Sequence, residues 1–362
     1  MTVALAGALL IAGLCFALCV RTGAPELISP RYPIHNLGLW AKLGFARVFK
    51  LPLYTQRQTL IASSAYYFET VARARNLAVT VLCGGGIALC GVIFQTIFKN
   101  PAASPTMLGV SNGIELGMLI LVLKYSADVF SKTTERYLLC FGMALAMLAL
   151  VMFLGKLVGG NRRSVTDMLL SGSILSQISG VVMMYFRFNM AQEDLQTLQT
   201  LTLYGFTVNT TYSFAGVSLV ILVMLLFLCV MPFILMRFSF DAMSFADEET
   251  ALLGINPGVV RALALFAVTF IMTAAILYCG SVGILSLVIP HACRAVFGAR
   301  FKTMLAGSAL LGALLLVICR VISSLIYIDG IGFLPIGPIV GLVSAPLLVA
   351  VLVKRRSAGY ET

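Results

Sequence analysis

Ten stretches of about 20 mostly apolar residues, separated by polar connectors, constrain this chain more than any other feature. A helix of roughly that length crosses the hydrocarbon core of a bilayer and hydrogen-bonds its own backbone polar groups. Only 11% of the 362 residues are charged and 60% are hydrophobic, unlike a soluble domain. The pattern predicts an all-α integral membrane protein, a ten-transmembrane-helix bundle with spans at 2–20, 76–98, 107–124, 137–158, 165–188, 213–236, 262–280, 282–298, 303–328 and 334–353.

The connectors are too short to fold separately, so we interpret residues 1–362 as a single transmembrane domain. The first apolar run lacks the basic segment that precedes a signal peptide core, and we assign it as the first span. The basic run 354–356 predicts a cytoplasmic C-terminus, because Lys and Arg accumulate on that side. Ten spans then place the N-terminus and the connector 238–261 in the cytoplasm too. The basic connector 21–75 falls outside the cell, against the usual bias.

Composition and motifs argue against several other functions. All nine cysteines lie in or beside apolar spans and none forms a CxxC pair, which disfavours a zinc site or a disulfide framework. The net charge of +11 is scattered over loops, so we expect no nucleic acid partner. The sequence carries no phosphate-loop, nucleophile-elbow or HExxH motif, and we expect no enzyme. The histidine at 291, with no second ligand nearby, predicts a structural hydrogen bond rather than a metal site.

The connector 238–261 is too polar to span a membrane and too long for a simple turn. Glu248 and Glu249 are followed by helix-forming residues up to Gly254, and Pro257 then suits the first turn of the next helix. We predict two short helices lying on a membrane face, with a plain solvated loop as the alternative.

The stretch FKNPAASPTMLGVSNG, at 98–113, interrupts one apolar run and begins another. Pro101 and Pro105 prevent a continuous helix, and Asn100 and Ser104 can hydrogen-bond the backbone groups that are released. Non-helical backbone at membrane depth persists only inside the protein or beside water. The stretch predicts a broken, reversing helix pair. From the residues alone, a structural turn and the lining of a pathway remain equally open.

Three separated motifs resemble those of the permease subunits of iron-siderophore, haem and vitamin B12 ABC importers. The stretch from Phe98 to Gly113 is similar to the family pattern RNPLA.P..LG...GA, and Gln95 fits the same pattern. Residues 280–294, GSVGILSLVIPHACR, resemble G.IGFVGLIVPH..R. Residues 334–337, LPIG, followed by Ala345 and Pro346, resemble the closing LP.G......G.P element. The resemblance runs in order from about residue 70 to 356.

The resemblance implies a type II importer with ten helices per permease and both termini in the cytoplasm. It implies as partners a second permease subunit, two ATPase subunits that carry ATP and Mg²⁺, an extracytoplasmic substrate-binding protein and the lipid of a bacterial plasma membrane. The permease itself would bind no cofactor and no metal. By the same resemblance, Arg73 and Arg75 would dock the binding protein, and the ATPase-coupling residues would be Asp247, Glu248, Glu249, Leu253 and Gly254.

Polar residues inside the spans are candidates for the transport pathway or its gate. A carboxylate within a span is energetically costly and usually functional, which singles out Glu115. Hydroxyl and amide groups on the fifth span could line a polar path, with hydrogen bonding between helices as the equal alternative. The pathway or gating candidates are Gln95, Asn100, Pro101, Asn112, Glu115, Ser173 and Gln177.

Departures from the family pattern bear on the second permease. Arg320 and Ser324 occupy positions where the family often has aspartate and arginine, and serines at 286 and 344 replace common glycines. This drift favours a heterodimer with a more typical permease chain, although a homodimer stays open. The expected cargo is an iron chelate, most simply a ferric siderophore, moved by alternating access. The alternatives are haem or cobalamin import and, less favoured, an ion-coupled secondary transporter.

Overall fold

The structure is a computed structural model that describes residues 57–130, 132–159, 165–205, 233, 236–243, 245–298, 300–328 and 332–359. The side chains of residues 57–75 lie outside this description. The predicted span 2–20, nearly all of 213–236 and the connector 21–75 as far as residue 56 also fall outside it. The count of ten spans therefore stays a prediction.

Helices account for nearly all of the described elements. In chain order they are α3 (Arg57–Ile97), the 3₁₀ turn η2 (Pro105–Leu108), α4 (Val110–Tyr125), the 3₁₀ turn η3 (Ser126–Phe130), α5 (Thr133–Gly159), α6 (Val165–Asn189), α7 (Gln192–Tyr204), α9 (Arg237–Ala242), α10 (Asp247–Leu252), α11 (Pro257–Cys279), α12 (Leu285–Phe297), α13 (Phe301–Leu325) and α14 (Ile336–Gly359). Among the described residues, five helical stretches are long and apolar enough to cross a membrane: Asn76–Ile97, Thr134–Val158, Asp167–Asn189, Pro257–Cys279 and Phe301–Ser323. The chain is a helical membrane protein with several apolar spans.

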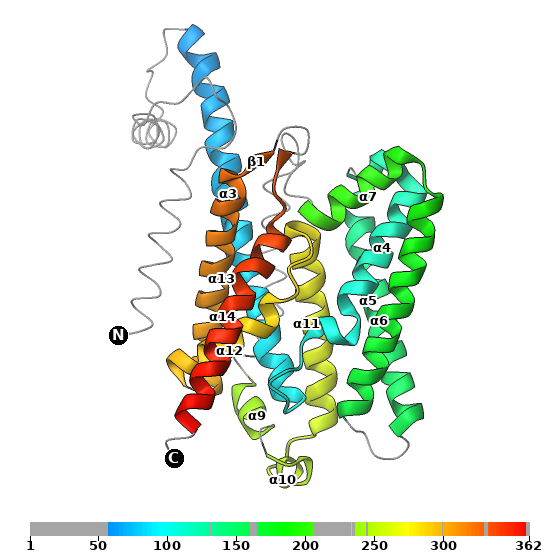
Figure 1. Ribbon diagram of the computed structural model, residues 1–362, viewed down its shortest axis with the longest axis vertical. Helices are drawn as coiled ribbons and strands as arrows, with labels where there is room; N and C mark the ends of the chain where they lie inside the picture. Colours follow the sequence, from blue (N-terminus) through cyan, green and yellow to red (C-terminus); the bar gives the residue numbers. More distant parts are fainter. Residues whose placement is uncertain are drawn as a thin grey trace.

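The helices form two groups that meet at α11 (Figure 1). One group contains α3, α12, α13 and α14, and the other contains α4, α5, α6 and α7. The helix α11 packs against α3 on one side and against α4 and α5 on the other. The short helices α9 and α10 lie at one end of the bundle, the end at which α14 also finishes (Figure 1). This arrangement agrees with the prediction that 238–261 and the C-terminus face the same side.

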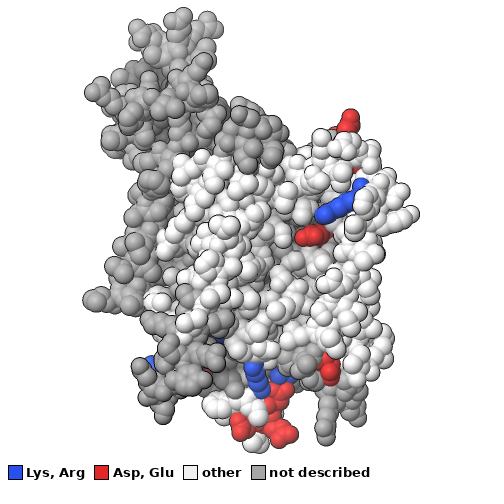
Figure 2. Space-filling view, in the orientation of Figure 1, with Lys and Arg blue, Asp and Glu red and all other residues white. Residues whose placement is uncertain are grey.

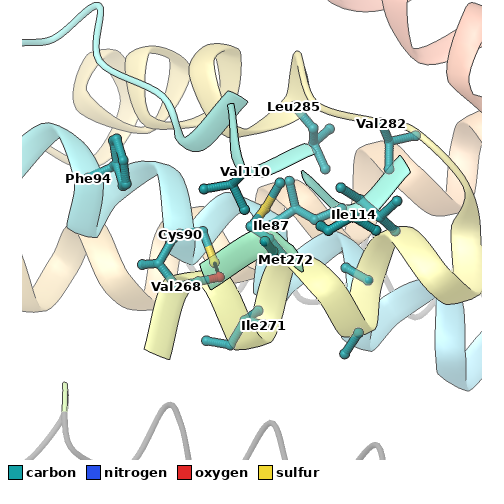
Figure 3. Close-up of a cluster of buried hydrophobic side chains, with 14 of the residues drawn as sticks. Ile87, Cys90, Phe94, Val110, Ile114, Val268, Ile271, Met272, Val282 and Leu285 are labelled. Atoms are coloured by element: carbon teal, nitrogen blue, oxygen red, sulfur yellow. Dashed lines mark hydrogen bonds between the residues drawn. The ribbon is translucent and has the colours of Figure 1, made fainter. Parts of the chain in front are cut away.

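The centre of the bundle is an apolar cluster contributed by α3, α4, α11 and α12. Figure 3 shows Ile87, Ile114 and Met272 lying close together, each of them fully buried. The thiol of Cys90 in the same cluster donates a weak hydrogen bond to the carbonyl oxygen of Val268, at 3.8 Å. Burial from lipid gains little for apolar groups, so close packing of this kind holds the helices together.

Small residues allow two pairs of helices to approach closely. A Cβ placed on Gly84 of α3 would lie 2.5 Å from the carbonyl oxygen of Gly312 in α13. A Cβ placed on Gly91 would lie only 1.8 Å from the carbonyl oxygen of Ser286 in α12. The glycines of α3 therefore serve close packing of helices.

Three predicted spans begin or end elsewhere. The span 107–124 is not one helix, because Gly109 adopts φ +72° between η2 and α4. The span 282–298 is reduced to the 13 residues of α12. The span 303–328 ends at Leu325, and the strands β1 (Tyr327–Ile328) and β2 (Gly332–Phe333) then pair antiparallel. The all-helical prediction holds apart from this hairpin of two-residue strands, in which Tyr327 and Phe333 are backbone partners and which the sequence did not indicate.

The helix α7 has no counterpart among the predictions. Its sequence is polar, with Glu193 and Asp194 in the first turn and only Leu198 and Leu201 fully buried. The last turn of α7 contacts the break after α11, where the amide of Ser281 donates to the carbonyl oxygen of Thr202 at 3.1 Å. An apolar-span criterion does not detect a helix whose stability comes from such tertiary contacts.

The prediction of two short helices in 238–261 is confirmed. Gly254 follows α10 with φ +78°, and Pro257 is the first residue of α11. The side chain of Asn256 caps α11 by accepting from the amides of Gly258 and Val259, at 3.0 and 3.3 Å.

Removing this cap should weaken the start of α11. We expect Asn256→Ala to lower the free energy of unfolding by about 1 kcal/mol, because two amides lose their acceptor. Thermal unfolding of the detergent-solubilised protein measures this change. Asn256→Asp, which keeps a capping oxygen, is the matched control and should retain stability; equal losses in both variants would contradict the capping role.

Candidate functional site

The helix α10 presents an exposed apolar and acidic surface at one end of the bundle. Leu252 and Leu253 are 88% and 52% exposed, and Glu248 and Glu249 are exposed beside them. The buried hydroxyl of Thr250 holds the helix in place by donating to the carbonyl oxygens of Ala242 and Ala246, each at 2.9 Å. Figure 2 shows acidic and basic side chains gathered at this end, below a nearly uncharged side wall. Large exposed apolar groups among charges are typical of a surface that contacts a protein partner.

Asp247 opens α10 but is oriented differently from the two glutamates after it. Its carboxylate accepts from the Lys99 Nζ at 2.8 Å and from two nitrogens of Arg261 at 2.7 and 2.8 Å. The hydrogen bonds from Arg261, ahead of those from Lys99, lower the pKa of the Asp247 carboxyl from 3.8 to about 2. Because the pKa is lowered, the contribution of this pair to stability is complete above pH 3.8 and is lost only as the pH falls toward 2.

The turn at 98–104 adjoins this ion pair. The Asn100 side chain accepts from the amide of Ala102 at 2.9 Å, which stabilises the turn locally. The carbonyl oxygen of Pro101 accepts from Nε2 of His291 in α12, at 2.9 Å. The predicted structural role of His291 is thereby confirmed, since its ring joins α12 to the turn. Among the described residues no group of three or more His, Cys, Asp or Glu side chains could hold a metal ion.

The predicted pathway residues on α3 and α4 occupy different surroundings. Gln95 is 3% exposed, and neither atom of its amide has a hydrogen-bond partner among the described residues. Asn112 donates to the carbonyl oxygen of Ser176 at 3.4 Å and so joins α4 to α6. Glu115 is half-buried and within electrostatic range of Arg187 of α6. These residues line the contacts of α3 and α4 with their neighbours and do not converge on one point.

Ser173 and Gln177 lie on the exposed side of α6. The hydroxyl of Ser173 donates to the carbonyl oxygen of Leu170 within the same helix, at 2.8 Å. Apolar residues surround them on this side, among them Ile174 and Ile178, both more than half exposed. The face is available to lipid or to a second chain. Arg73 and Arg75 fall on α3, and their side chains lie outside the described part of the chain.

The partners of Asp247 were missed from the sequence. Lys99 stands 148 positions away in the chain, and its backbone adopts an uncommon positive φ of 51° directly after α3. Arg261 was assigned no role, although a basic residue close to the start of a helix is electrostatically unfavourable without a nearby anion. That local conflict was the one available indication of a carboxylate partner.

Comparison with known proteins gives a consistent family assignment. The sequence model of the FecCD transport family matches residues 37–354. The chain is 29% identical to an iron chelatin transport system permease protein of Helicobacter pylori, over 78% of this chain and 82% of that one. It is 29% identical to the Fe(3+) dicitrate transport system permease protein FecD of Escherichia coli, over 80% and 86% of the two chains.

Two further likenesses extend the comparison. The chain is 27% identical to the vitamin B12 import system permease protein BtuC of Yersinia enterocolitica, over 78% of this chain and 80% of that one. A solved structure of a metal-chelate type ABC transporter in an inward-facing conformation superposes with a TM-score of 0.72 at 20% identity, covering 98% of each chain. The second likeness supports the helical fold described above.

Proposed function

The chain belongs to the FecCD transport family and is a multi-pass permease subunit of a bacterial ABC importer, and we propose that its cargo is a ferric siderophore. As a permease of this class it works with an ATPase and a substrate-binding protein, and it contains no catalytic domain of its own. Its cargo is an iron chelate, vitamin B12 or a similar compound.

The likeness to iron-chelate permeases carries the choice of cargo. Relatives whose names specify iron chelatin and ferric dicitrate each match at 29% identity over more than three quarters of the chain. A permease path is wide and selects weakly, whereas the binding protein selects strongly, so the cargo proposal concerns the complete importer. The iron is cargo inside its chelator, and the permease needs no metal ligands to carry it.

The proposed assembly contains two permease chains, two ATPase subunits and one external binding protein. Each permease would contribute ten spans, with both termini in the cytoplasm, and the departures at Arg320 and Ser324 favour a heterodimer. The exposed leucines and glutamates of α10 would contact an ATPase subunit, on which ATP and Mg²⁺ bind. Closure of the ATPase pair would then move α10 and open the path to one side of the membrane at a time. Arg73 and Arg75 would dock the binding protein outside.

Cobalamin is the second candidate cargo. The observation that favours it is the 27% identity to a vitamin B12 permease over a similar share of the chain. This value is below the 29% identity to the two iron-chelate relatives, so cobalamin ranks second.

Uptake by the reassembled importer tests the proposal. The permease would be expressed with its neighbouring permease, ATPase and binding-protein genes in a bacterium that lacks its own chelate importers. We expect uptake of radiolabelled iron supplied as a ferric hydroxamate, ferric catecholate or ferric dicitrate, and no uptake of labelled cobalamin or haem. Uptake of cobalamin or haem alone would overturn the siderophore proposal. Iron uptake that persists after the ATPase gene is deleted would favour an ion-coupled transporter instead.

A further inference from the structure

Asp247 differs from the rest of the candidate ATPase-coupling surface because its carboxylate pairs with basic residues of the permease itself. Glu248 and Glu249 are exposed, and the Glu249 carboxylate accepts a local hydrogen bond from the amide of Ala246 at 3.3 Å, within the same segment. The Asp247 carboxylate instead accepts three hydrogen bonds from the two cations Lys99 and Arg261. Two of these bonds come from the planar fork of one guanidinium, the geometry that fixes a carboxylate most firmly. With three of its roughly four acceptor positions used, this carboxylate has less capacity for a partner protein than an unpaired one, although the side chain is 48% exposed.

The two cations belong to the ends of two spans. Lys99 follows the C-terminus of α3, and Arg261 lies in the first turns of α11. Arg261 also reaches back to α3, because its Nε donates to the carbonyl oxygen of Ile97 at 3.3 Å. The first turn of α10 is therefore bonded to both spans through one carboxylate. The low pKa of about 2 keeps this carboxylate ionised throughout the physiological pH range.

The chain of hydrogen bonds that joins Asp247 to Lys99 and Arg261 continues from Lys99 into the interior of the bundle. The next two residues hold the turn at 98–104, through the Asn100 side chain and the bond from His291 to the carbonyl oxygen of Pro101. The turn leads into η2, which lies against Gly172 of α6 and against Gly283 between α11 and α12. A Cβ on Gly172 of α6 would meet the carbonyl oxygen of Met107 at 2.3 Å, and one on Gly283 would meet the Thr106 methyl at 2.4 Å. Little free space remains at these contacts, so displacement of the turn must displace its neighbours.

We propose that Asp247 is a positioning residue that transmits movement of α10 to the 98–104 turn through Lys99 and Arg261, and is not a contact for the ATPase. This inference rests on the proposed function, because it takes α10 as the surface that the ATPase moves. It divides four of the five predicted coupling residues into two sets, while Gly254 ends α10 with its positive φ. Glu248, Glu249 and Leu253 would face the ATPase, while Asp247 faces the permease.

The test uses the complete importer in lipid nanodiscs, with Ala102→Cys as a reporter in the exposed part of the turn. The labelling rate of this cysteine by a membrane-impermeant maleimide is measured with and without ATP plus vanadate, and the importer without A102C gives the background from native cysteines. We expect ATP plus vanadate to change the rate. In D247N the ATPase should still co-purify, and the ATP-dependent change should fall about fivefold or more, the range of a lost coupling.

Variants of the partner residues separate coupling from simple instability. Lys99→Arg preserves the charge and should preserve the ATP-dependent change, whereas Lys99→Gln should reduce it. Adding Lys99→Gln to D247N should reduce the ATP-dependent change in labelling rate little further, because both substitutions remove the same bond between Lys99 and Asp247. Glu193→Gln removes an exposed carboxylate on α7, far from the turn, and should leave the change intact. The melting temperature of each assembled variant is measured alongside.

Each contrary outcome has a distinct meaning. Loss of the ATPase in D247N would show that Asp247 is a docking contact and overturn the inference, while the proposed function stands. An unchanged ATP-dependent labelling change in D247N, or no such change in the importer carrying A102C alone, would also overturn it while uptake continues. Failure of any ATPase to co-purify with the unmodified chain would overturn the proposed function together with the inference.

Discussion

Loss of ATPase binding is the expected result of replacing Leu252 and Leu253 together with alanine. These leucines are 88% and 52% exposed at the end of the bundle, and neither packs into the core. Alanine keeps the helical backbone of α10, so the substitution removes contact area without unfolding the segment. Buried apolar anchors contribute roughly 1–2 kcal/mol or more each at protein interfaces. We expect the ATPase recovered with the purified permease to fall by about tenfold or more, and ATP-driven uptake to be lost.

An exposed leucine elsewhere provides the control. Leu138 of α5 is 67% exposed at the opposite end of the bundle, and Leu138→Ala should leave ATPase recovery unchanged. Glu248→Gln with Glu249→Gln should have a smaller effect that grows at low salt, because exposed charges contribute mainly long-range attraction. Full ATPase recovery from the double alanine variant would place the ATPase on another surface.

The short helices of this surface could be predicted because their boundaries are local. Gly254 ends α10 with a positive φ, and Pro257 with the cap at Asn256 begins α11, so three residues close together define the junction. The long apolar helices could be predicted for a similar reason, since length and hydropathy alone mark a segment that satisfies its own backbone inside lipid. The family resemblance was confirmed by the match over residues 37–354.

The remaining features depend on contacts between distant parts of the chain. Asp247 differs from its two neighbouring glutamates because it pairs with Lys99, which lies 148 positions away in the sequence. The spacing of residues within α10 does not reveal this pairing. The helix α7 was not predicted because its sequence has no long apolar face. It is stabilised instead by contacts with the 278–281 segment. The broken helix pair at 98–113 could be predicted from its prolines, but the start of α4 after Gly109 could not, because it depends on a single positive φ. The roles of Gln95, Glu115, Ser173 and Gln177 stay predictions.

A severe loss of folded protein is the expected result of Gly91→Ala. The Cβ would lie 1.8 Å from the carbonyl oxygen of Ser286, 2.7 Å from its carbonyl carbon and 3.0 Å from the Pro290 side chain. Two of these atoms are backbone of α12 and cannot rotate away, so α3 and α12 must separate. We expect a cost of about 3 kcal/mol or more, the upper range for overpacking. Thermal unfolding and size-exclusion profiles of the solubilised permease measure the loss.

Gly142→Ala distinguishes this contact from a general intolerance of substitution within helices. A Cβ on Gly142 of α5 meets no heavy atom within 4 Å among the described residues, so alanine there adds helix propensity worth up to about 1 kcal/mol without a clash. Replacing glycine with alanine should therefore lower the melting temperature at Gly91 and raise it at Gly142. Equal melting temperatures for the two variants would mean that α3 and α12 do not cross at Gly91. The crossing bears on the proposed coupling because α12 carries His291, whose bond to Pro101 joins this contact to the turn beside the candidate ATPase-coupling surface.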